Sequence, residues 1–129
     1  MRLPAQLLQQ IVGHPVAQFA GSGHKRALGR VEVHKSAAMH PIRDEMIGES
    51  IFVSIRDVSA ETIGLSSPIA MMPFSSLILS IPVDNSQNIA LRCRVMRCTR
   101  NFGGPFSLVA EFVSRVDPQT LQAIPVAGT

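Results

Sequence analysis

The clearest alternation of hydrophobic and polar positions lies in IFVSIR, residues 51–56. A period of two is typical of a strand with one buried face. The alternation ends at Asp57-Val58-Ser59, where a carboxylate and a hydroxyl two residues apart project from the same side of an extended backbone. Asp and Ser side chains bind turn amides, so this segment predicts a turn before the next strand at Ile63-Gly64-Leu65.

The same criterion predicts six strands along the chain. Pro68 and Pro73 require the third strand to end early, and Pro82 stops the fourth strand before a turn at residues 84–86. Residues 34–49 are expected to form a polar, irregular connection, long enough for a short helical turn or a strand extension. The predicted strands include residues 31–33, 51–56, 63–65, 77–81, 89–96 and 108–113, with a turn at 101–105 before the last.

Two short helices are predicted to flank these strands. Apolar residues at helical spacing predict an amphipathic helix over residues 4–12, with a stop at Gly13. Residues 13–24 are rich in Gly and small residues and are expected to form a linker. Asp117 and Pro118 fit the first positions of a closing helix through Ile124. The expected organisation is residues 1–24 as helix and linker, 25–116 as a β-barrel, and 117–129 as helix and tail.

The composition narrows the class of protein. A chain of 129 residues suits one domain with a single core. No long apolar window and no secretion-signal pattern are present, so neither a membrane span nor export is expected. Cys93 and Cys98 have an odd separation, which points them to opposite faces of a regular strand. Free thiols are therefore expected, and they favour a reducing cytoplasm.

The candidate chemistry is that of binding rather than catalysis. The four histidines have no metal-ligand spacing, and no Ser, Cys or His lies in a recognisable nucleophile arrangement, so no metal, no catalytic residue and no enzyme activity are expected. The net charge of +3 arises mainly from arginine. The guanidinium fork matches phosphates and the O6 and N7 edge of guanine, which favours a phosphate-bearing partner.

Arg26 and Arg30 flank a small segment at the entrance to the first strand, and DVSAETIGL follows at residues 57–65. This combination resembles the PilZ domain family, which pairs an RxxxR loop with a [D/N]xSxxG motif. The resemblance covers roughly residues 25–115 and implies a bacterial six-stranded antiparallel β-barrel, all-β apart from the terminal helices. It also implies binding of cyclic di-GMP without a further cofactor, and signalling through a protein partner not identified by the sequence; a homodimer is left open.

The resemblance implies a role for each motif residue. Arg26 and Arg30 would clamp phosphate and the guanine edge, Asp57 would accept hydrogen bonds from guanine, and Ser59 would bind phosphate or guanine. The segment from Thr62 to Gly64 would pass beneath the base. Thr62 stands where the motif has glycine, and if that position required a left-handed backbone, the substitution would cost about 1–2 kcal/mol.

Two alternatives to a cyclic di-GMP receptor follow from the same residues. Thr62, with the outward-facing Val109 and Val113, favours a PilZ-like protein-interaction module that does not bind nucleotide. Four arginines in or next to the fifth strand allow single-stranded nucleic-acid binding, but the chain has no Trp or Tyr for base stacking, so DNA and RNA are not the expected partners. These arginines are Arg92, Arg94, Arg97 and Arg100.

Overall fold

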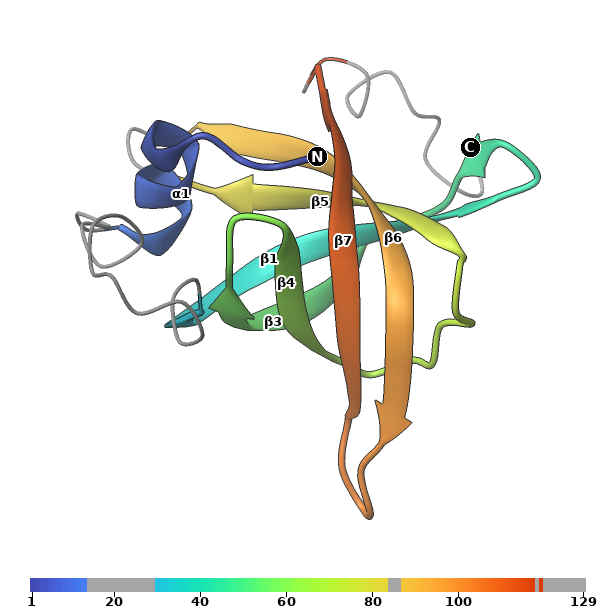
Figure 1. The fold of residues 1–129 in the computed structure, drawn as a ribbon. Coiled ribbons are helices and arrows are strands. Elements are labelled where there is room, and N and C mark those ends of the chain that lie inside the picture. Colours follow the sequence, from blue (N-terminus) through green and yellow to red (C-terminus); the bar gives the residue numbers. More distant parts are fainter. Residues whose placement is uncertain (14–29, 84–86, 118, 120–129) are drawn as a thin grey trace.

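The computed structural model describes residues 1–13, 30–83, 87–117 and 119, and it shows antiparallel strands with one short helix (Figure 1). The helix packs against the strands from outside the barrel (Figure 1). Most of the predicted linker, the turn at 84–86 and most of the predicted C-terminal helix lie outside the described residues. The elements are α1 (Ala5–Val12), β1 (Val31–Arg43), β2 (Met46–Ile47), β3 (Ile51–Val58), β4 (Thr62–Ser67), β5 (Ser76–Pro82), β6 (Asn88–Arg100) and β7 (Phe106–Val116).

The sheet closes into a barrel. Its order is β2-β1-β3-β4-β7-β6-β5, and a further pairing of β1 with β5 joins the two sides. The two-residue strand β2 only extends the hairpin that follows β1. The closed part is therefore the six-stranded antiparallel barrel that the sequence predicts, and closure leaves few unpaired strand edges.

Strand β1 is longer than predicted. Of the two alternatives left open within residues 34–49, the strand extension is the one found, because β1 continues to Arg43; the expectation of an irregular connection is wrong for this first part. Ala37, Met39 and Pro41 face the interior at alternate positions. Small and polar neighbours hide this period in the sequence. Pairing with β3 on one side and β5 on the other holds the segment extended, and such tertiary context overrides weak strand propensity.

Strand β6 carries both cysteines, and its irregular register decides where they point. The pairing with β7 shifts between Val95 and Arg97, as in a β-bulge. The extra residue reverses the alternation, so Cys93 is fully buried and the half-buried Cys98 packs against the same core. The expectation of opposite faces is therefore wrong, although both thiols are free.

Helix α1 packs against one end of the barrel (Figure 1). Leu7, Leu8 and Ile11 are buried in the barrel core, and Gly13 ends the helix in the left-handed conformation, with φ of 89°. The Lys35 ammonium group, on β1, links α1 to β5 by donating hydrogen bonds to the carbonyl oxygens of Ile11 and Pro82, each at 3.0 Å. Within the described residues, no helix has the length and apolar character needed to span a membrane.

Candidate functional site

The motif residues meet at the end of the barrel that α1 covers. Arg30 directly precedes β1, Asp57 lies next to the last residue of β3, and Thr62 begins β4. These three strands are antiparallel neighbours, so the start of β1, the end of β3 and the start of β4 lie together. Distant segments of the sequence thus form one cluster.

Arg30 holds the cluster together. Its Nη2 donates to Asp57 Oδ1 at 2.7 Å, and its Nη1 donates to Thr62 Oγ1 at 3.0 Å. The Arg30 and Asp57 side chains are 49% and 32% exposed. An ion pair in such contact with water contributes at most about 1 kcal/mol to stability. A ligand can therefore exchange this pair for bonds of its own at little cost.

Ser59 organises the turn between β3 and β4. Its Oγ accepts from the amides of Thr62 at 3.0 Å and Glu61 at 3.3 Å, and its own amide donates to the Thr62 carbonyl oxygen at 2.8 Å. The Ser59 and Thr62 hydroxyls lie 2.9 Å apart. This is the local side-chain capping that Ser provides at turns. In this conformation the hydroxyl of Ser59 thus forms its hydrogen bonds within the turn rather than with a ligand.

Gly64 leaves the space that the Asp57 carboxylate occupies. The two residues face each other across β3 and β4, and a Cβ built on Gly64 would lie 2.6 Å from Asp57 Oδ1. That separation is far inside van der Waals contact. Glycine at this position is therefore explained by the close approach of the Asp57 side chain rather than by an unusual backbone angle.

Thr62 has no left-handed backbone. It begins β4, pairs with Glu111 of β7, and is not among the described non-glycine residues with positive φ. The conformational penalty considered for this substitution therefore does not arise. What distinguishes Thr62 from glycine here is its side chain, whose hydroxyl fills the space between Arg30 and Ser59.

The N-terminal segment is bonded to the same turn. The Leu3 amide donates to the Ala60 carbonyl oxygen at 2.7 Å. On the other side, the Phe112 amide donates to the Glu61 carbonyl oxygen at 3.0 Å, and the Met1 ammonium group donates to the Phe112 carbonyl oxygen at 2.8 Å. Sequence reasoning missed these contacts because backbone bonds between distant segments leave no residue-type signal.

Five of the six residues predicted to bind ligand thus lie together, namely Arg30, Asp57, Ser59, Thr62 and Gly64. Arg26 lies outside the described residues. In the described part of the chain, no three His, Cys, Asp or Glu residues gather as a metal site would require. Of the four arginines considered for nucleic acid, Arg94 is paired with Glu111.

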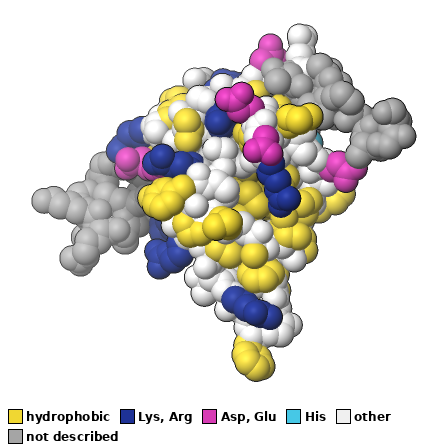
Figure 2. Space-filling model, turned by 90° about the vertical axis from the view of Figure 1, so that its right-hand side faces the viewer, with side chains coloured by type: hydrophobic (Ala, Val, Ile, Leu, Met, Phe, Trp, Pro, Cys, Tyr) yellow, Lys and Arg dark blue, Asp and Glu magenta, His cyan; other side chains and the backbone are white. Residues whose placement is uncertain are grey.

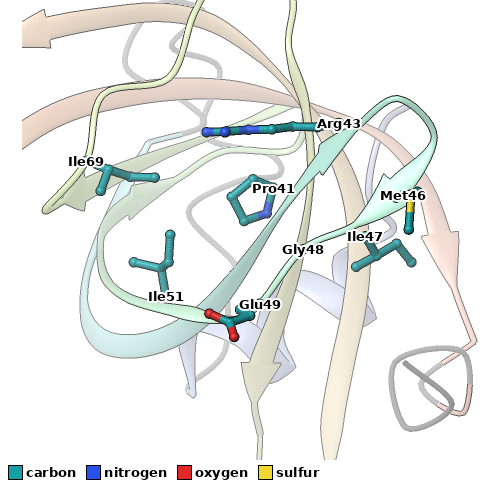
Figure 3. A pocket seen from close by; sticks show the side chains of 8 residues that line it. All are labelled: Pro41, Arg43, Met46, Ile47, Gly48, Glu49, Ile51 and Ile69. Atoms are coloured by element: carbon teal, nitrogen blue, oxygen red, sulfur yellow. The ribbon is translucent and has the colours of Figure 1, made fainter. Parts of the chain in front are cut away.

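A separate hollow of about 410 Å³ lies at the opposite ends of β1 and β3 (Figure 3). Pro41, Ile51 and Ile69 give it an apolar lining, and Arg43 and Glu49 lie on either side of Pro41 in this view. Its lining is mostly apolar, so the Arg30 and Asp57 cluster, in which polar groups meet at hydrogen-bond distance, is the better candidate for a nucleotide site.

Comparison with known proteins gives the class of protein. The family model described as PilZ domain matches residues 24–124, so the chain belongs to the PilZ domain family. No curated protein matches. A solved structure, described as Bacillus subtilis Inhibitor of motility (MotI/DgrA), is similar with a TM-score of 0.56 and 17% identity. The match covers 78% of this chain and 48% of that chain, so it supports the barrel fold alone.

Proposed function

We propose that this chain is a non-catalytic receptor domain that binds cyclic di-GMP in the bacterial cytoplasm. The observation that carries the proposal is the convergence of Arg30, Asp57 and Thr62 at one end of the barrel, with Gly64 making room for the carboxylate. Membership of the PilZ family supports the choice of ligand.

Guanine fits the groups that Arg30 and Asp57 present. The Asp57 carboxylate can accept from the N1–H and the exocyclic amine of guanine, two donors on the same edge of the base. The Arg30 fork then leaves Asp57 and binds O6 and N7 or a phosphate, as arginine does elsewhere. Arg26, four residues earlier in the chain, is proposed as the second arginine of this clamp.

The contacts of the turn suggest how binding is relayed. Ala60 and Glu61 join the motif turn to Leu3 and to β7 through backbone hydrogen bonds. A ligand that displaces Arg30 from Thr62 changes the forces on this turn. The N-terminal segment and α1 then alter their packing, which a partner protein can detect.

One observation favours a second function. The Thr62 hydroxyl bonds to both Arg30 and Ser59 and so holds the arginine over Asp57 in a closed arrangement. If the ligand cannot displace this side chain, the domain is a protein-interaction module without nucleotide. Thr62→Gly removes the obstructing side chain and distinguishes the two functions.

The test is isothermal titration of cyclic di-GMP, with cyclic di-AMP and GTP as ligand controls. Arg30→Ala and Asp57→Ala are each expected to weaken binding by about tenfold or more, since a hydrogen bond to a charged group contributes about 1.5–3 kcal/mol. The matched control is Arg56→Ala, because Arg56 is an exposed arginine of β3 that bonds to Ser107 instead of Asp57.

The titration separates the possible results. Selective heat that is lost in both site variants and kept in Arg56→Ala supports the receptor. Heat that appears only in Thr62→Gly supports the interaction module. Silence of both the unchanged protein and Thr62→Gly at high micromolar ligand refutes cyclic di-GMP binding. Binding that survives in both site variants refutes the site assigned to Arg30 and Asp57.

A further inference from the structure

The hairpin of β6 and β7 extends beyond the other strands, and one of its edges is open (Figure 1). Strand β6 pairs with β7 as far as Arg100, but with β5 only as far as Arg94. The amide and carbonyl of Val95 bond to the loop before β5, at 2.8 and 2.7 Å. From residue 96 to 100, the side of β6 away from β7 pairs with no described strand.

An open edge offers backbone hydrogen bonds. In an antiparallel strand, alternate residues direct both N–H and C=O toward the same neighbouring strand. Residues 96–100 therefore present donors and acceptors to solvent on this side. An exposed edge of this kind is a template on which another extended chain can pair.

Hydrophobic side chains surround the open edge. Met72 and Phe74, in the loop before β5, are 78% and 72% exposed. Met96 of β6 is 44% exposed, and Phe102 at the hairpin tip is fully exposed. The Phe74 amide bonds to Val95, which holds the loop beside β6. Figure 2 shows hydrophobic side chains gathered on this side of the molecule, with Lys and Arg side chains among them. Such apolar exposure indicates a partner.

The positive charge beside the open edge indicates the chemistry of the partner. Arg97 and Arg100 are exposed and form no ion pair with a described residue, in contrast to Arg94, which is paired with Glu111. The segments 68–76 and 96–106 contain no Asp or Glu. Acidic side chains would therefore meet unopposed positive charge here, and complementary charge selects partners and accelerates their association.

We propose that the open edge of β6, residues 96–100, binds an extended acidic segment of a partner protein as an added strand. Backbone hydrogen bonds align the segment, and its apolar residues contact Phe74 and Met96. Arg97 and Arg100 lie an odd number of residues apart and so point to opposite faces of the strand, where acidic residues on the two faces of the added segment pair with them. The unused backbone groups favour a polypeptide over a lipid surface, which has no strand to add.

This edge is separate from the candidate nucleotide site. Thr62 pairs with Glu111 near one end of β4, whereas Ser67 pairs with Phe106 at the other end, next to the hairpin tip. The proposed strand addition therefore does not rest on cyclic di-GMP binding. It can be tested in the absence of nucleotide.

The probe is a short fluorescein-labelled peptide that repeats Glu-Glu-Val-Val and so carries Glu and Val on both faces of an extended strand. Binding is followed by anisotropy and by backbone amide NMR shifts. The double variant with Arg97→Glu and Arg100→Glu is expected to bind the peptide about tenfold or more weakly, since two charge-assisted contacts become repulsive. The matched control Arg92→Glu changes an exposed arginine of β6 where the strand is paired on both sides, and should leave the affinity nearly unchanged.

Two further peptides test strand addition on the unchanged protein. The same peptide with Lys in place of Glu should not bind, and the Glu and Val peptide methylated at alternate backbone nitrogens should bind at least about tenfold more weakly. Amide shifts should centre on residues 96–102. Shifts centred elsewhere, equal binding of the Lys or methylated peptide, or no binding at high micromolar protein would overturn the proposal, as would binding of phosphatidylglycerol vesicles in place of the acidic peptide.

Discussion

At the residue scale, the candidate site depends on a missing side chain. Gly64 is buried opposite Asp57, and a Cβ on Gly64 would lie only 2.6 Å from the Asp57 carboxylate oxygen Oδ1. The carboxylate therefore lies against β4, where its Oδ1 is 2.7 Å from Nη2 of Arg30. Because the separation from a Cβ is far inside van der Waals contact, even one methyl group has to displace the carboxylate.

Gly64→Ala is therefore expected to separate Asp57 from Arg30 and to lower the free energy of unfolding by about 1–3 kcal/mol, the usual cost of overpacking. Urea unfolding measures the stability. Isothermal titration of cyclic di-GMP should show a loss of affinity of about tenfold or more.

Gly104→Ala is the matched control for this prediction. Its Cβ would meet only Asn101 Cβ, at 4.0 Å, so neither stability nor binding should change appreciably. If Gly64→Ala is as stable as this control, the steric role assigned to Gly64 is wrong.

At the element scale, α1 is stable because it packs on the barrel. Eight residues are too few for an isolated helix to persist in water. The helix has no side-chain cap at its start, and its buried face supplies Leu7, Leu8 and Ile11 to the core. Its neighbouring residues Met1 and Leu3 bond to β7 and to the motif turn.

Ile11→Ala is expected to lower the free energy of unfolding by about 2–5 kcal/mol, because Ile11 is fully buried and truncation leaves a cavity. Gln10→Ala, on the exposed face of the same helix, should change it by no more than about 0.5 kcal/mol. Urea unfolding compares the two. Equal stability of the two variants would show that α1 does not contribute to the core.

At the scale of the whole molecule, the closed barrel buries a thiol at its centre. Burial raises the pKa of Cys93 from 9.0 to about 12. Between these values the unfolded chain loses the thiol proton and the folded protein keeps it. The folded state then binds more protons than the unfolded state, so its stability falls as the pH rises above about 9.

Urea unfolding from neutral pH to about pH 10 should therefore show a steeper loss of stability for the unchanged protein than for Cys93→Ala, which lacks this thiol. Cys98→Ala is the control, because it retains Cys93 and should follow the unchanged protein. Parallel pH profiles of the unchanged protein and Cys93→Ala would contradict the burial of a neutral thiol. A reducing agent must be present throughout so that oxidation does not enter the comparison.

The sequence by itself determined the barrel class, most strand positions and the residues of the candidate site. Period-two alternation along β3 and β5 and the breaks at Pro68 and Pro82 are local properties of the chain, so they can be identified without coordinates. The motif residues Arg30 and Asp57 could be identified because their spacing, together with Ser59, resembles the motifs of the PilZ domain family.

Only the tertiary structure decided how these parts meet. The full length of β1 depends on its pairing with both β3 and β5, and the direction of Cys98 depends on a bulge in β6. The clearance over Gly64 and the open edge beyond Val95 are likewise set by contacts between strands distant in sequence. Such contacts follow from register and closure of the sheet, which no local pattern of residue types records.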